Sequence, residues 1–199
     1  MSKITRLAVL VVGLMSLFGI MSASAGAVTW DNSGSTTFHA TAGTGTLSST
    51  GVTLSCTGAT ATGDAPTGST VANVYDVRGT ATFTGCLLSG ISTGVHCGFT
   101  LTGTTQPTTA VTTTGDVDVT CDVTQFNTKI CHISGSDHFI YTNPVAGVAT
   151  LTLTTGGNLR TSNPPTGTCP LGNGDLAHLS ETTFRTTAGT SAPILHRTP

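Results

Sequence analysis

Charged side chains are scarce in this sequence. They account for 8% of the 199 residues, against roughly 25% in an ordinary soluble domain. The only lysines are Lys3 and Lys129, and Glu181 is the only glutamate. Because so few basic residues cannot form a patch, the sequence argues against nucleic acid as a partner and excludes polybasic attraction to anionic lipid.

Aromatic side chains are also few, at 5% of the residues. A surface that stacks on sugars or nucleobases usually presents several exposed rings, so the sequence does not favour such a platform. Four phenylalanines instead fall inside β-patterned runs, where we expect core positions: Phe38, Phe83, Phe99 and Phe139.

Strong helix formers are scarce as well, and no helical periodicity occurs after residue 27. Threonine, at roughly a fifth of the residues, and glycine, with 25, are abundant instead. Threonine is β-branched and favours strands, whereas glycine supplies the positive φ that tight turns need. The β-patterned runs are residues 27–30, 36–40, 51–62, 71–86, 95–103, 116–124, 130–134, 138–142, 147–155 and 179–187.

These runs are separated by short Gly-rich or Pro-rich segments, and the composition shows no domain boundary. Many short strands at near-regular spacing are typical of a sandwich or a barrel. We therefore predict a single all-β domain over residues 28–199, an antiparallel β-sandwich stapled by disulfides, with a barrel as the alternative. Residues 103–115 are expected to form a loop, because they are mostly threonine around one proline.

Residues 1–27 have the three parts of a secretory signal peptide. Lys3 and Arg6 give a positive start, a long apolar run follows, and small residues end the segment. Cleavage fits after Ala25 or after Ala27. The apolar run is shorter than the about 20 residues of a membrane span, so we expect export to the medium or the cell envelope without a span. The mature chain keeps five basic and nine acidic residues, a net charge of −4.

All six cysteines follow this segment: Cys56, Cys86, Cys97, Cys121, Cys131 and Cys169. An even number in an oxidising compartment predicts three disulfides, for which fifteen pairings exist. Strict alternation from Asp116 to Val123 places Cys121 on the apolar face of a strand. If the chain turns around Phe126, Cys121 lies opposite Cys131 and within disulfide range, so we prefer this pair. The other pairs would then be Cys86–Cys97 and Cys56–Cys169.

Three acids, Asp116, Asp118 and Asp122, share the polar face of that strand. Carboxylate oxygens bind Ca²⁺, so these are candidate calcium residues, but no Ca²⁺ loop motif is present and we favour a solvated face. His96-Cys97 and Cys131-His132 lack the C-x₂₋₄-C spacing of structural zinc, and their thiols should be bridged. We expect no cofactor.

Catalytic motifs are missing from the sequence. G-x-S-x-G, H-E-x-x-H and the Walker loop do not occur. Asp137 precedes His138, but adjacent residues on a strand point to opposite faces. No two acids are nominated as a glycosidase pair. The sequence therefore predicts a protein that is not an enzyme.

Several segments carry a resemblance to a known kind of protein. They are residues 54–58, 82–86, 141–143, 149–153, 168–170, 174–175 and 179–184. In these segments the chain resembles small exported Thr/Gly-rich β-proteins of high-GC Gram-positive bacteria. The resemblance covers most of the chain after residue 27. It implies a secreted bacterial β-domain and assigns no catalytic or binding residue.

Three functions fit these features. We expect a secreted or envelope-associated, non-enzymatic β-domain with a structural, adhesive or protein-interaction role, whose partners are the cell surface or further copies of the chain. An alternative is an extracellular binding module for a small apolar or sugar ligand, which an internal cavity of roughly several hundred Å³ would favour. A third is a secreted hydrolase on a β-scaffold, which needs converging catalytic side chains.

Overall fold

A computed structural model of the protein describes residues 28–71, 74–107, 111–187 and 192–198. The predicted signal peptide, residues 1–27, lies outside the described residues. The described chain consists of strands joined by turns and loops, so the prediction of an all-β fold with antiparallel pairing and disulfides is confirmed. No described segment forms a helix that could cross a membrane.

The strands fall into three groups by length and place in the chain. Four are long: β7 (Tyr75–Leu88), β8 (Ile91–Thr105), β9 (Thr112–Gln125) and β10 (Thr128–Val145). Eight are shorter and follow one another in four successive pairs: β2 (Thr37–Ala42) and β3 (Gly45–Ser49), β4 (Val52–Cys56) and β5 (Gly58–Asp64), β11 (Val148–Thr154) and β12 (Leu159–Ser162), β13 (Leu176–Leu179) and β14 (Thr182–Thr186). The last three form a separate small sheet: β1 (Thr29–Asn32), β6 (Gly68–Val71) and β15 (Leu195–Thr198).

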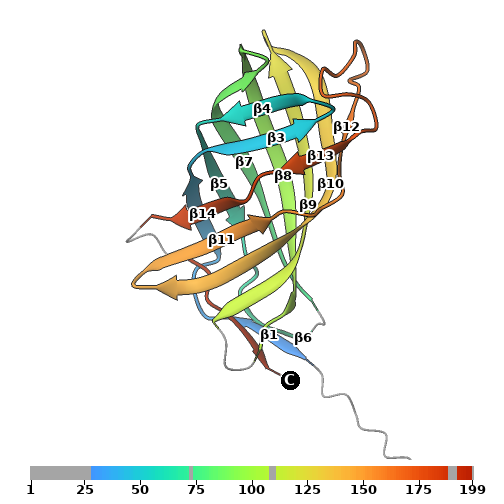
Figure 1. Ribbon diagram of the computed structural model, residues 1–199. Helices are drawn as coiled ribbons and strands as arrows, with labels where there is room; N and C mark the ends of the chain where they lie inside the picture. The colour runs from blue at the N-terminus through green and yellow to red at the C-terminus, as the bar shows by residue number, and fades with distance from the viewer. Residues whose placement is uncertain (1–27, 72–73, 108–110, 188–191, 199) are drawn as a thin grey trace, which may run out of the picture.

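The large sheet closes on itself. β7, β8, β9 and β10 pair in that order, and β10 also pairs with both β11 and β12. These pair with β14 and β13, which pair with β2 and β3. β2 and β3 pair in turn with β5 and β4, which return to β7. The core therefore lies between opposite walls of one continuous cylinder (Figure 1), the closed alternative of the prediction, rather than between two separate layers.

Alternating side chains divide the wall into an apolar inner face and a polar outer face. In β9, Val117, Cys121 and Val123 are buried, whereas Asp116 and Asp118 are exposed, as the alternation predicted. The predicted core phenylalanines also lie inside, with Phe139 buried and the other three packed against the core clusters. Two corrections concern strand bounds. Residues 130–134 and 138–142 belong to the single strand β10, and strands cover much of the predicted loop at residues 103–115.

A row of phenylalanine and glycine fixes the packing of one wall. Phe38, Gly63, Gly79 and Phe99 lie opposite one another across β2, β5, β7 and β8. The two rings meet over the two glycines, with centroids 6.3 Å apart. A Cβ atom on Gly79 would lie 2.5 Å from the Phe99 ring and 2.4 Å from the carbonyl oxygen of Thr62. Glycine is needed here because the rings occupy the space that a side chain would take.

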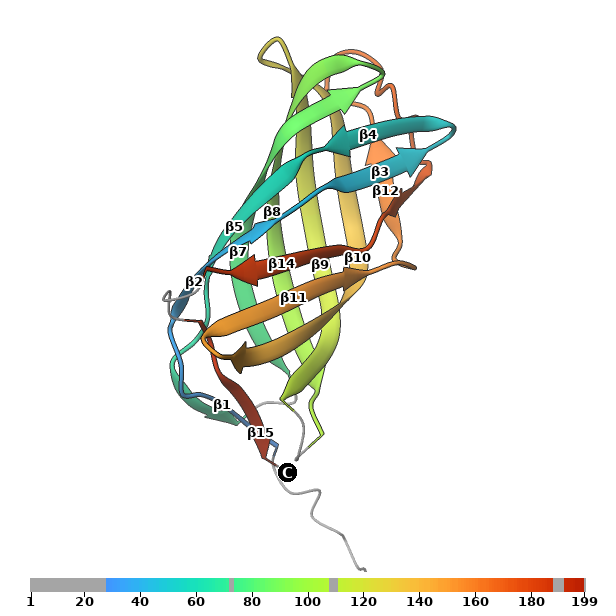
Figure 2. The same ribbon diagram turned by 60° about the vertical axis from the view of Figure 1, so that its left-hand side comes forward.

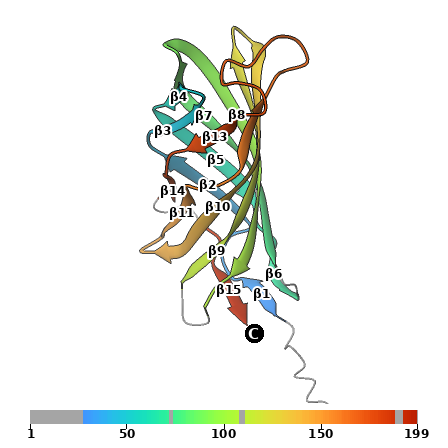
Figure 3. The same ribbon diagram turned by 45° about the vertical axis from the view of Figure 1, so that its right-hand side comes forward.

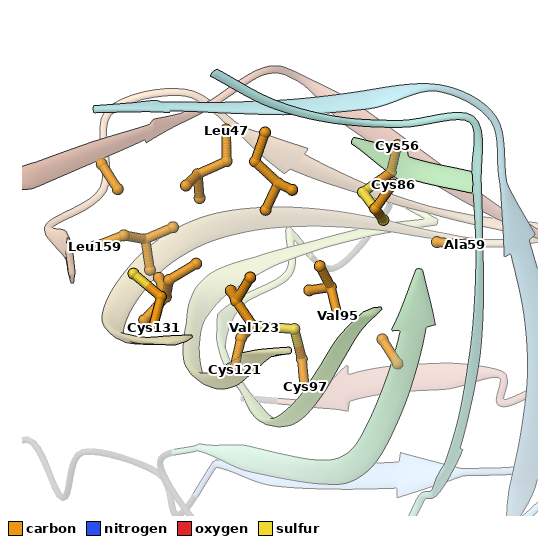
Figure 4. Packing of buried hydrophobic residues seen from close by; sticks show 14 of the residues in the cluster. Leu47, Cys56, Ala59, Cys86, Val95, Cys97, Cys121, Val123, Cys131 and Leu159 are labelled. Atoms are coloured by element: carbon orange, nitrogen blue, oxygen red, sulfur yellow. A yellow bond between two sulfur atoms is a disulfide. The ribbon is translucent and has the colours of Figure 1, made fainter. Parts of the chain in front are cut away.

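All six cysteines are bridged, but the predicted pairings are wrong. The disulfides join Cys56 to Cys86, Cys97 to Cys121 and Cys131 to Cys169, in place of Cys121–Cys131, Cys86–Cys97 and Cys56–Cys169. Figure 4 shows the bridged sulfurs of the first two pairs among the buried aliphatic side chains.

The physical reason for the error is the register of the β9–β10 hairpin. Its ladder shifts between Lys129 and Cys131, so Cys131 lies opposite Val123, and Cys121 lies opposite Ile133. A strand inside a sheet also has a second neighbour, and on that side Cys97 lies directly opposite Cys121. Directly opposed antiparallel residues are close enough to form a disulfide.

The small sheet closes the end of the cylinder that lies near the C-terminus (Figure 3). Trp30 of β1 is fully buried there. The buried amide of Asn143 donates to the carbonyl oxygen of Leu195 at 2.8 Å and accepts from its N–H at 2.9 Å. Gln106 donates to the same carbonyl oxygen at 2.8 Å. Side-chain amides thus replace the strand partner that β15 lacks on this side and hold it against the cylinder.

Gly79→Ala should destabilise the fold by about 1–3 kcal/mol, because the new Cβ must displace the Phe99 ring or the neighbouring backbone. The matched control is Gly98→Ala in the adjacent strand, where a Cβ would meet nothing within 4 Å. The control should change stability by less than about 0.5 kcal/mol. Urea unfolding of both variants measures the difference, and equal stabilities would contradict the packing of this row.

Candidate functional site

Several charged and histidine side chains of β9 and β10 lie on the outer face, among them Asp116, Asp122 and His138. Asp122 forms an ion pair with Lys129, whose Nζ lies 2.6 Å from Oδ2 of the carboxylate. It also contacts His132, whose Nδ1 lies 2.9 Å from Oδ1. The Lys129 ammonium, followed by His132, holds the pKa of Asp122 below its ordinary value of 3.8. More than a third of this carboxylate side chain is exposed, so solvent screens the interaction and its effect on stability is small.

The three calcium candidates do not converge on one point. Asp116 contacts His138, with Nδ1 2.6 Å from Oδ1, whereas Asp122 is paired with Lys129 and His132. Among the described residues, no group of three or more His, Cys, Asp or Glu side chains could hold a metal ion. Asp116 and Asp122 therefore belong to separate surface contacts, and Asp118 is exposed.

These aspartate–histidine pairs lack a nucleophile. In the described part of the chain, neither the His132 nor the His138 imidazole makes a hydrogen bond to a hydroxyl. All six thiols are bridged. A triad needs a nucleophile within hydrogen-bond reach of the base. His132 and His138 have no such contact among the described hydrogen bonds, whereas Nδ1 of the neighbouring His96 lies 3.3 Å from the hydroxyl oxygen of Thr82.

The interior holds two adjoining apolar cavities, of about 80 Å³ and about 50 Å³. Ala61, Leu101 and Phe184 line both of them. Asp137 is the one acid in the lining of the larger cavity, and its Oδ1 accepts the backbone N–H of His138 at 2.8 Å. Pockets for drug-sized ligands usually measure roughly 300–1,000 Å³, so the core is largely filled by its own side chains.

Residues 163–175 pack against the cylinder and contribute Leu171 and Cys169 to its core. Leu171 is fully buried there, and Cys169 is bridged to Cys131 of β10. The carbonyl oxygen of Leu171 accepts the hydroxyl of Thr50 at 3.0 Å, which ties this segment to the turn between β3 and β4.

The turns between paired strands present the most exposed apolar side chain of the described protein. Four hairpins have two-residue turns with positive φ at both positions: Thr50-Gly51, Ser89-Gly90, Phe126-Asn127 and Ala146-Gly147. This turn type favours Gly, Asn or Asp. Three of the four carry a small residue first, whereas the fourth carries Phe126 at φ 49° with 89% of its surface exposed.

Two further apolar side chains are exposed beside the neighbouring β7–β8 turn. The Gln125 amide donates to the Thr93 hydroxyl at 3.2 Å, which joins the β9–β10 turn to the β7–β8 hairpin. Beside that second turn, Leu87 is 48% and Ile91 is 47% exposed. Both hairpins project at the end of the cylinder away from the C-terminus (Figure 2). We call Leu87, Ile91 and Phe126 the apolar tips.

The apolar tips were not predicted from the sequence, which indicated only that the chain turns around Phe126. The available signal was a large apolar residue in a two-residue turn, a position where bulky side chains carry backbone strain.

No protein-family model matches the chain, and neither curated proteins nor solved structures give a match. The geometry alone therefore nominates the apolar tips as the candidate site.

Lys129→Gln should raise the pKa of Asp122 towards its ordinary value, because the neighbouring ammonium is the largest cause of its depression. Stability from this interaction is present above the ordinary pKa and is lost as the pH falls through the lower, folded-state pKa. NMR titration of the Asp122 carboxyl measures the shift. Arg185→Gln, which removes one positive charge from the distant strand β14, should leave that pKa unchanged, and equal effects would contradict the assignment.

Proposed function

We propose that the protein is an exported, non-enzymatic attachment domain that contacts its partner through the apolar tips. The observation that carries the proposal is Phe126, a large ring held almost fully exposed on a turn whose backbone disfavours it. Neither burial nor turn geometry stabilises the fold through this side chain. Contact with a partner outside the chain would bury the ring and so explain its presence there.

The disulfides support this function because they make the apolar tips rigid. Each strand of the two tip hairpins carries a bridged cysteine: Cys86 in β7, Cys97 in β8, Cys121 in β9 and Cys131 in β10. Rigid presentation lowers the entropy lost on binding. The bridges are also typical of an oxidising compartment, in agreement with the export that the first 27 residues predict and with the resemblance to exported bacterial β-proteins.

The interior offers less support for the alternative functions. The two cavities are small and mostly apolar, with Asp137 and a few hydroxyl-bearing side chains in their lining. A carrier of small ligands usually encloses a larger space with a few placed polar groups. The histidine–aspartate pairs of the outer face lie on an exposed wall rather than in a cleft, which does not favour hydrolysis.

Phe126→Asn should reduce attachment while the fold remains intact, because asparagine tolerates positive φ better than phenylalanine does. The measurement is the fraction of the exported protein that sediments with the producing cells rather than remaining in the medium. Because the variant loses one phenyl ring that would be buried on attachment, its binding constant for cells should fall by about tenfold or more.

Val145→Ser is the matched control for this experiment. Val145 is 67% exposed beside the β10–β11 turn, outside the apolar tips. Its replacement should leave attachment unchanged. A wild-type protein found only in the medium, or equal attachment of the Phe126→Asn variant, would refute the proposed function.

A further inference from the structure

We infer that the apolar tips insert into the surface of a lipid bilayer, an inference that rests on the proposed attachment function. The first argument is shape. Phe126 stands in the β9–β10 turn, Leu87 and Ile91 flank the β7–β8 turn, and none of the three lines either internal cavity. A stable protein–protein interface needs roughly 800 Å² from each partner, which three side chains on two turns cannot supply. A bilayer surrounds projecting side chains completely without requiring a complementary surface.

The second argument is the composition around the apolar tips. Residues 86–94 and 123–131 contain no acid, and their single basic residue, Lys129, is paired with Asp122. Carboxylates would oppose insertion, and unpaired lysines would instead indicate attraction to anionic headgroups. The segments therefore favour apolar insertion that depends little on the charge of the lipid.

The third argument is the polar character of the residues that flank Phe126 in the sequence. Gln125, Asn127 and Thr128 flank Phe126 and carry amide and hydroxyl groups. Such groups suit the hydrated headgroup layer, whereas the ring reaches the acyl boundary below it. Only one phenyl ring and two half-exposed aliphatic side chains would enter the bilayer. Binding to the membrane is therefore reversible rather than permanent.

The test is co-sedimentation of the mature protein with phosphatidylcholine vesicles. The wild type and Val145→Ser should bind equally, and Phe126→Asn should bind about tenfold more weakly. Raising the salt concentration from about 0.05 M to about 0.5 M should leave wild-type binding unchanged, because screening weakens only charge attraction. Thermal unfolding should show that Phe126→Asn is at least as stable as the wild type, which separates lost binding from lost folding.

A fluorescent probe locates the insertion. Phe126→Trp should give blue-shifted emission when vesicles are added and should be quenched by brominated lipid. The wild-type chain is the control, because its single tryptophan, Trp30, is fully buried at the opposite end of the cylinder and should not respond.

Two results would overturn the inference: no binding to phosphatidylcholine vesicles, or binding only to phosphatidylglycerol vesicles that salt reverses. If attachment to cells still depended on Phe126 in that case, the attachment function would stand with a partner other than lipid. If attachment to cells were also absent, the proposed function would fail together with the inference.

Discussion

The structure depends on one contact, the ladder that joins the first part of the closed wall to the last. Phe184, Arg185 and Thr186 of β14 pair with residues 40–42 of β2, and β13 continues the same register along β3. Without this ladder the large sheet would have two open edges, which invite pairing with other chains. With it, the Thr-rich outer face can remain low in charge without exposing a long unpaired strand of the large sheet. In the proposed function, contacts with a partner are then made by the turns.

Closure also explains which parts of the fold could be predicted from the sequence. Alternation along each strand is local, so the inner and outer faces of β9 were predicted correctly, as was the turn around Phe126. The disulfide pairs depend on two non-local facts, the register shift after Lys129 and the presence of β8 on the other side of β9. Neither fact is visible in residue spacing, so the Cys121–Cys131 prediction failed.

The candidate site was harder to predict than the fold for a related reason. Groups that carry chemistry are recognisable from residue type, and Asp116, Asp118 and Asp122 lie on one face as the alternation predicted. The apolar tips are instead defined by exposure, which depends on how little the rest of the fold covers Leu87, Ile91 and Phe126. Only the strained turn at Phe126 has a local signature, a bulky residue where glycine or asparagine is favoured.

Amide hydrogen exchange measures closure of the large sheet. The paired amides of β2 and β14 should exchange as slowly as those of β9, because all three strands lie inside the same closed ladder. Exchange of the β2 and β14 amides at the rate of free edge strands, while β9 remains protected, would contradict closure. It would also leave two open edges as competing sites of attachment.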